Sequence, residues 1–241
     1  MASANLELLR ALSSLFYPPV CTICLGSVET GEYLCDDCHA KTPRISPPFC
    51  ARCSEPFSGT MSGIFTCANC SHRRLYFEAA VAVYRSRGIV RRVVHQFKYG
   101  HQMHLQHLVG QWLHATLEDE RLRGRQFDVI VPVPLHPARQ RERGFNQAAL
   151  LALLLGERIA APVKPVLERI RYTTTQTAFD RSERMENLRG AFRLRRKMDV
   201  RGLRVLLVDD VLTTGATLSE CARILKKAGS ASIHAATAAR A

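Results

Sequence analysis

The spacing of apolar residues changes along the chain and separates its helices from its strands. Leucines and one phenylalanine within residues 6–16 mostly share one face at helical spacing, which predicts a short amphipathic helix in the first 20 residues. That face either packs on this same protein or docks on a membrane surface or a partner. From residue 76, strand patterns alternate with helical periodicity. The predicted strands are 76–84, 127–134, 163–167, 204–210 and 232–238, and the predicted helices are 89–97, 105–117, 146–159 and 218–228.

This alternation predicts an α/β domain built on a parallel sheet. Residues 204–210 (RVLLVDD) form a continuous apolar run that ends in two acids, as expected for a strand in the middle of such a sheet. Ligands of parallel sheets bind at the carboxyl ends of the strands. The segment that follows Asp210 is therefore the first place to look for a binding site.

Residues 21–70 differ from the rest because they hold eight of the nine cysteines, in four CxxC pairs. Two thiolates at this spacing reach one tetrahedral Zn²⁺, and two pairs complete a four-cysteine site. Neighbouring pairs predict two structural zinc sites, although the short linkers leave interleaved pairing open. The predicted ligands are Cys21, Cys24, Cys35 and Cys38 in the first zinc site and Cys50, Cys53, Cys67 and Cys70 in the second.

The alternatives to zinc are a disulfide framework and redox dithiols. Disulfides need an oxidising compartment, and a signal peptide fits poorly because Glu7 and Arg10 interrupt the first apolar stretch. Metal suits the regular two-residue spacing better, and it would supply the folding energy of ribbons that have little core. We therefore expect an N-terminal helix and a double zinc ribbon in residues 1–75, followed by the α/β domain in residues 76–241.

Composition and charge sharpen this division. The 241 residues include 46% hydrophobic residues, enough to bury a core, and no apolar run reaches the roughly 18 residues that span a bilayer. We therefore expect a soluble globular protein without a transmembrane segment. The net charge is +13, but residues 1–80 carry −1 and residues 81–241 carry +14. The positive charge thus belongs to the α/β domain.

Residues 205–218 (VLLVDDVLTTGATL) are the most informative segment. A turn containing Gly215 between a strand and a helix exposes backbone N–H groups, the helix N-terminus adds its dipole, and threonine hydroxyls add donors. Together these features predict a monophosphate cradle, which we call the phosphate loop (residues 213–217). The nearby carboxylates suit a sugar diol or a Mg²⁺-linked ligand. The segment lacks the Gly-Lys-Ser/Thr ending of a Walker loop.

This segment resembles the fingerprint with which type I phosphoribosyltransferases bind phosphoribosyl pyrophosphate (PRPP). Residues 127–152 and 169–194, with four CxxC pairs ahead of them, resemble the ComF family of competence proteins over nearly the whole chain. The resemblance implies a type I phosphoribosyltransferase-like fold. It also implies that the acidic pair contacts the ribose hydroxyls and that the phosphate loop holds the 5-phosphate of PRPP or a related ribose 5-phosphate.

Site residues follow from the resemblance by position. Lys98 and Arg143 could supply cations for a diphosphate, because the pyrophosphate-loop position at residues 134–136 offers few donors. Residues 171–189 occupy the place of a mobile hood loop, with Thr175, Gln176, Arg181 and Asn187 as candidate contacts. The predicted catalytic residues are Asp209 and Asp210, and the predicted PRPP-binding residues are Asp209, Asp210, Thr213, Thr214, Gly215, Ala216, Thr217, Lys98 and Arg143.

The function implied is cytoplasmic handling of incoming single-stranded DNA in natural transformation, with Mg²⁺ accompanying PRPP. Residues 85–101 contain five basic residues and no acid, and residues 169–204 carry a net charge of +7. The predicted nucleic-acid contacts are Arg91, Arg92, Lys98, Arg171 and Arg181. Two alternatives stay open. One is an active phosphoribosyltransferase of unknown acceptor. The other is an adaptor, regulated by PRPP, whose ribbons dock a competence helicase or the DNA-uptake machinery at the inner face of the membrane.

Overall fold

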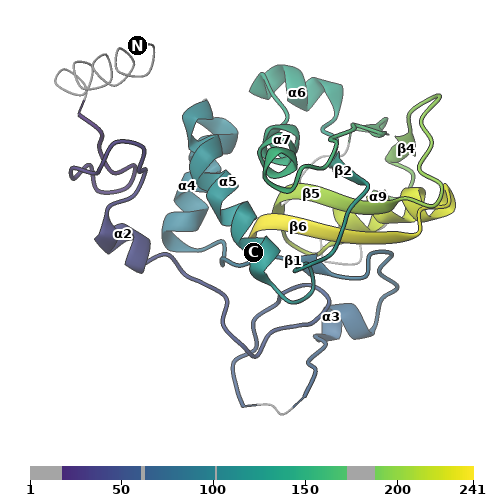
Figure 1. The fold of residues 1–241 in the computed structure, drawn as a ribbon, viewed down its shortest axis with the longest axis horizontal. Coiled ribbons are helices and arrows are strands. Elements are labelled where there is room, and N and C mark those ends of the chain that lie inside the picture. Colours follow the sequence, from purple (N-terminus) through teal and green to yellow (C-terminus); the bar gives the residue numbers. More distant parts are fainter. Residues whose placement is uncertain (1–17, 61–62, 101, 173–187) are drawn as a thin grey trace.

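The computed structural model describes residues 18–60, 63–100, 102–172 and 188–241 (Figure 1). Most of the predicted N-terminal helix lies outside these residues. The same is true of four predicted hood contacts, namely Thr175, Gln176, Arg181 and Asn187. Within the described ranges, no helix has both the length and the apolar character needed to cross a bilayer.

A parallel sheet of four strands forms the centre of the α/β part, as predicted. Its order is β1 (Ala80–Val81), β6 (Ser232–Arg240), β5 (Arg204–Leu212) and β2 (Val129–Pro132). Leu207 on β5 lies opposite both Val131 and Ala235, which fixes the register across the three longest strands. These strands are apolar on both faces because helices cover both faces of the sheet.

The helices were largely predicted, with small shifts at their ends. On one face α4 (Gly88–Tyr99), α5 (Gln106–His114) and α7 (Gln147–Ile159) share a hydrophobic cluster with the sheet, and α9 (Ala216–Lys227) packs on the other face (Figure 1). The helix predicted at 105–117 is divided. It comprises η1 (Met103–Leu105), α5 and η2 (Ala115–Glu118), and the short helix α6 (Pro137–Arg143) was not predicted.

Two strand predictions were wrong in extent. Residues 163–167 are not a strand of the main sheet, since only Val163 bridges to it and the flanking prolines lack N–H donors. The chain instead forms β3 (Leu167–Arg169), which pairs with β4 (Phe192–Leu194) in a separate antiparallel sheet. The strand predicted at 76–84 contributes only β1. The backbone N–H of Glu78 still donates to Ile233 of β6, while the N–H of Ala80 donates to the carbonyl of Arg52.

Two ribbons precede this sheet and lie at different places on it (Figure 1). The first ribbon (residues 18–41) contains α2 (Asp36–Ala40) and packs on α4 and α5, where Tyr33 stacks on His104 and His107. The second ribbon (residues 49–72) contains α3 (Ala68–Ser71), and its four cysteines join the hydrophobic cluster beneath α9. The second ribbon therefore shares a core with the α/β part.

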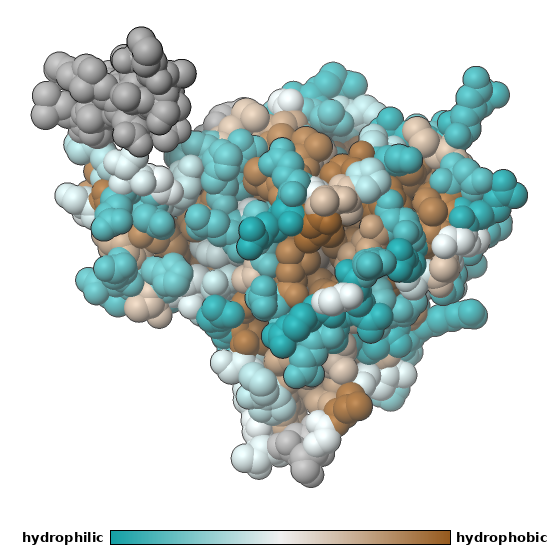
Figure 2. Space-filling view, viewed as in Figure 1, coloured by the Kyte–Doolittle hydropathy of each residue, from teal (hydrophilic) through white to brown (hydrophobic). Residues whose placement is uncertain are grey.

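In the view of Figure 2, hydrophilic side chains cover much of the surface, hydrophobic ones gather over its centre, and a small separate hydrophobic spot lies near the lower tip. Ile64 of the second ribbon is 88% exposed and is the most exposed of the large hydrophobic side chains in the described residues.

Candidate functional site

Each predicted cysteine tetrad is assembled in space. The four sulfur atoms of each tetrad lie within 4.8 Å of one another, and the tetrads pair neighbouring CxxC motifs in sequence, as predicted. A tetrahedral Zn²⁺ with bonds of about 2.3 Å holds its sulfurs at such spacing. None of the nine cysteines, all of which lie in the described ranges, forms a disulfide. The arrangement fits two structural zinc sites.

Hydrogen bonds are shared unequally among the thiols of the second zinc site. Those from Cys53 and Cys70 hold the pKa of Cys50 well below its usual range, and the backbone N–H of Cys67 donates to the Cys50 sulfur at 3.3 Å. The same thiol–thiol bonds, with burial, raise the pKa of Cys53 and Cys70. These contacts favour the thiolate at Cys50, which is the form that binds a metal.

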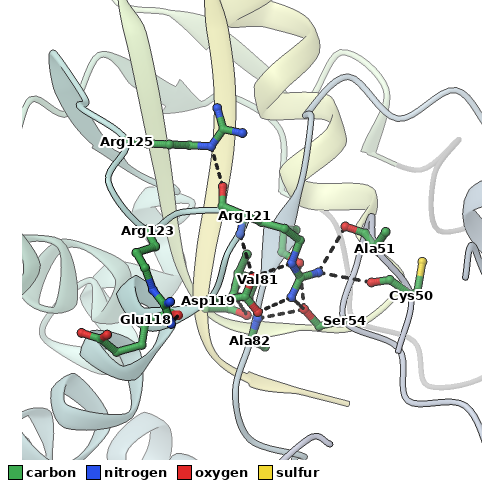
Figure 3. Close-up of polar contacts among 12 residues, drawn as sticks. Cys50, Ala51, Ser54, Val81, Ala82, Glu118, Asp119, Arg121, Arg123 and Arg125 are labelled. Atoms are coloured by element: carbon green, nitrogen blue, oxygen red, sulfur yellow. Dashed lines mark hydrogen bonds and ion pairs between the residues drawn. The ribbon is translucent and has the colours of Figure 1, made fainter. Parts of the chain in front are cut away.

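Arg121 fastens the second ribbon to the α/β part (Figure 3). Its guanidinium donates to the carbonyls of Cys50 and Ala51, each at 3.2 Å, and to the hydroxyl of Ser54 at 2.9 Å. Asp119 holds the same guanidinium through two hydrogen bonds of 2.7 Å. Burial acts to raise the pKa of Asp119, but the bonds from Arg121 outweigh it and lower that pKa. One buried ion pair thus orders the carbonyls around the first cysteine of the second zinc site.

The phosphate loop joins β5 to α9 as predicted. Gly215 stands at the N-cap of α9 with φ of +78°, a conformation that favours glycine, and it brings no side-chain acceptor to the helix. Thr214 accepts the N–H of Ala216 at 3.3 Å. The next N–H groups, of Thr217 and Leu218, have no partner within the helix by its geometry. The loop therefore offers backbone donors and the positive end of a helix dipole to an anion.

Asp209 and Asp210 lie near the carboxyl end of β5, separated from this loop by Val211 and Leu212. Lys98 of α4 forms an ion pair of 2.9 Å with Asp210. Burial and the adjacent Asp210 raise the pKa of Asp209 to about 7, against the opposing charges of Lys98 and Arg169. The predicted acidic pair and one predicted cation are thus brought together.

Arg169 is a residue of this site that the sequence did not reveal. It lies on β3 with its guanidinium 5.4 Å from the centre of the Phe192 ring, and burial lowers its pKa. Its charge opposes the rise in the pKa of Asp209, as that of Lys98 does, although Lys98 and Arg169 lie some 70 residues apart in the chain. Because the strand here was predicted to end at Leu167, nothing in the local pattern pointed to Arg169.

The predicted cation Arg143 lies at the end of α6 and contacts other residues than the acidic pair. Its guanidinium stacks 4.7 Å from the Tyr99 ring centre, donates to the Tyr99 hydroxyl at 2.9 Å, and donates to Gln147 at 3.2 Å. On the same helix, Arg139 stacks 5.6 Å from the centre of the Tyr172 ring. Two arginines on α6 are therefore each paired with a tyrosine from another segment.

The predicted nucleic-acid contacts are only partly collected. Arg91 and Arg92 are exposed on α4, where they line a shallow hollow with His95. Lys98 is directed at Asp210, and Arg171 donates to the carbonyl of Arg189 at 3.1 Å. Arg181 lies outside the described residues.

Comparison with known proteins agrees with both halves of the molecule. A family model described as a double zinc ribbon domain matches residues 12–72, and one described as a phosphoribosyl transferase domain matches residues 105–241. The second match covers more than half of the chain and contains β5, the acidic pair and the phosphate loop.

Several bacterial proteins are similar over most of the chain. Competence protein F of Haemophilus influenzae is 30% identical over 215 residues, which are 87% of this chain and 91% of that protein. DNA utilization protein YhgH of Escherichia coli K12 is 30% identical over 91% of this chain and 96% of its own length. Competence protein ComFC of Bacillus subtilis is 27% identical, with 88% and 86% covered.

Proposed function

We propose that this chain, which belongs to the phosphoribosyl transferase domain family and resembles competence proteins over most of its length, binds PRPP and handles single-stranded DNA in natural transformation. The observation that carries the proposal is the end of β5. There the acidic pair, Lys98 and an uncapped helix N-terminus converge on one loop. The names of the related proteins support the competence role, and the cytoplasm, where incoming strands are received, is part of the proposal.

The chemistry of the loop matches the parts of PRPP. Thr213, Thr214 and Thr217, with the first amides of α9, would donate to the 5-phosphate. The carboxylates of Asp209 and Asp210 would accept hydrogen bonds from the ribose hydroxyls. When bound, Mg²⁺ would reduce the negative charge of the diphosphate. Lys98 already neutralises one oxygen of Asp210. The diphosphate of the ligand, rather than the acidic pair alone, would therefore hold Mg²⁺.

A basic and aromatic surface near the loop supports the DNA part of the proposal. Arg91 and Arg92 are exposed on α4, and the helix ends at Tyr99, which is 52% exposed and stacked on Arg143. Tyr172 is 47% exposed and stacked on Arg139. Arginine side chains suit the phosphates of a single strand, and half-exposed rings suit stacking on its bases. A strand running from α4 to α6 would meet both.

Fluorescence anisotropy of a labelled single-stranded oligonucleotide tests this surface. We expect wild-type binding to weaken with salt, and Arg91→Ala/Arg92→Ala to reduce the slope of log K against log salt by about 1.4, since each lost phosphate contact removes about 0.7. Lys226→Ala/Lys227→Ala removes the same charge from the far end of α9 and serves as the control. Equal slopes for the two variants, or no wild-type binding at low salt, would exclude α4 as the DNA surface.

Transformation frequency in cells tests the DNA part of the proposal. A chain with Arg91→Ala/Arg92→Ala should keep its ligand pocket, so a fall in transformation frequency would report on DNA handling.

The DNA-uptake machinery, including a helicase at the inner face of the membrane, is the partner class to which the ribbons would dock in such a role.

A further inference from the structure

The phosphate loop is held from outside by the second ribbon. Asn69 stands between Cys67 and Cys70, and its side-chain amide donates to the carbonyl of Thr214 at 3.2 Å. Thr214 is buried and is the second residue of the phosphate loop. A hydrogen bond therefore joins a turn between two predicted zinc ligands to the backbone of the loop, across 145 residues of sequence.

Arg240 makes a second connection between the same two parts. It is 4% exposed, and its guanidinium donates to the carbonyl of Cys53 and to the carbonyl of Leu212, each at 3.2 Å. Glu55 of the second ribbon pairs with the same guanidinium. Cys53 is a predicted zinc ligand, and Leu212 is the last residue of β5 before the loop. One buried cation thus bridges the zinc site and the base of the loop.

Packing adds a third connection. The Phe77 ring lies 3.6 Å from the position that a Cβ on Gly215 would take, so it supports the loop from below. The backbone N–H of Tyr76 bonds to the hydroxyl of Ser219 at 3.4 Å, in the first turn of α9. The cysteines of the second zinc site belong to the same hydrophobic cluster as Phe77 and Leu218. The loop is therefore touched at both of its ends and along its underside.

The first ribbon offers a natural comparison. Asp37 occupies in the first ribbon the position that Asn69 occupies in the second, but it is exposed. The first ribbon packs on α4 and α5, and its Cys24 is exposed, whereas all four cysteines of the second zinc site are buried. The two zinc sites have the same four-cysteine composition and differ in the parts of the protein on which they pack.

We propose that the second zinc site and the phosphate loop form one cooperative unit, in which the metal holds the loop in its ligand-binding shape and bound ligand slows loss of that metal. The inference rests on the proposed PRPP site. A four-residue helix such as α3 is not stable alone, so loss of the metal removes the Asn69 donor. Because coupling between two binding events is reciprocal, each ligand must strengthen the other by the same factor. Asn69 is thus a positioning residue, and the first zinc site is uncoupled.

The test measures zinc release to a chromogenic chelator, with and without PRPP and Mg²⁺, alongside calorimetric PRPP binding. Cys24→Ser marks the release phase of the first site. We expect PRPP to slow release from the second site several-fold and to leave the first unchanged. Asn69→Ala should weaken PRPP binding by about three- to ten-fold, as for loss of one hydrogen bond, and should reduce the protection. Asp37→Ala should behave as wild type in both measurements.

The outcomes separate this inference from the proposed function. If wild type binds PRPP but loses zinc from the second site at the same rate with and without it, the coupling is wrong and the proposed function stands. The same conclusion follows if Asn69→Ala and Asp37→Ala bind PRPP equally. If wild type does not bind PRPP, both proposals fail. The protection measurement uses the wild-type chain, so it decides the question even if Asn69→Ala does not fold.

Discussion

At the scale of single residues, the two adjacent carboxylates of the site, Asp209 and Asp210, share one direct ion pair among the described residues, and Lys98 forms it with Asp210. The partly buried Asp209 beside it has a pKa raised to about 7 by burial and by its neighbour, despite the charges of Lys98 and Arg169. A carboxylate that is partly buried without a direct ion pair destabilises the fold. Such a residue is tolerated where a ligand is expected to supply the missing partners.

Asp209→Asn should therefore change how stability depends on pH. The folded pKa of about 7 lies above the ordinary 3.8, so the folded chain holds a proton that the unfolded chain releases, and stability falls as pH rises between these values. The variant lacks this loss. Its free energy of unfolding relative to wild type should rise by at least about 1 kcal/mol between pH 5 and pH 8, measured by urea denaturation.

Asp199→Asn supplies the control for this pH dependence. Hydrogen bonds from Arg201 hold the pKa of Asp199 at about 2, so its contribution is lost only as pH falls below the ordinary value. Its difference from wild type should stay constant between pH 5 and pH 8. An equally constant difference for Asp209→Asn would show that Asp209 ionises in the folded chain as it does in the unfolded one.

Residue-level prediction succeeded where the site is continuous in sequence. Asp209 to Thr217 follow one another, so the acids, the glycine and the threonines could be recognised together. Arg169 and Asn69 could not, because tertiary packing brings the charge of Arg169 near Asp209 and the amide of Asn69 to the loop from distant segments. No local spacing marks a single arginine or asparagine as facing a loop far along the chain.

At the scale of elements, the second ribbon is an anchored part of the α/β core. Arg121 orders its carbonyls (Figure 3), and its cysteines share a hydrophobic cluster with α9. The first ribbon packs on α4 and α5 with more of its cysteines open to solvent. Two motifs of the same composition thus differ in packing, a difference that composition alone does not encode.

Arg121→Ala should destabilise the protein strongly. The Arg121 and Asp119 side chains are only 16% and 15% exposed, so removing the arginine leaves a half-buried carboxylate and three acceptors without their donor. We expect a loss of about 3 kcal/mol in the free energy of unfolding, measured by chemical denaturation. Arg125→Ala removes an exposed arginine from the same loop and should cost less than about 1 kcal/mol. Similar losses for both variants would mean that Arg121 does not anchor the ribbon.

Elements were predictable where apolar periodicity was long and uninterrupted. The predictions of β5, α7 and α9 were confirmed within a few residues. Residues 163–167 also looked apolar, but Pro162 and Pro165 interrupt the ladder and the strand begins only at Leu167. The strand expected from residue 76 is reduced to β1, and the backbone N–H groups of Ala80 and Ala82 bond to the second ribbon, a tertiary contact that the local pattern does not show.

At the scale of the whole molecule, the basic helices and the second ribbon lie on different sides of the phosphate loop. The basic residues of α4 and α6 lie on the side of the sheet that also carries the first ribbon, while the second ribbon supports the loop from beneath (Figure 1). The net charge of +14 in residues 81–241 could be read from the sequence. The stacking of Arg143 on Tyr99 and of Arg139 on Tyr172 could not. Under the proposed function, a phosphorylated sugar and a nucleic acid strand would approach neighbouring surfaces.

The central claim is that the end of β5 and the phosphate loop bind PRPP, and calorimetric titration of PRPP with Mg²⁺ tests it most directly. We expect saturable one-to-one binding by wild type and binding at least ten-fold weaker by Asp209→Asn/Asp210→Asn, because hydrogen bonds to charged acceptors are lost. Asp199→Asn, which removes an exposed acid paired with Arg201, should bind as wild type does. Absence of wild-type binding, or equal affinity in the double variant, would contradict the account.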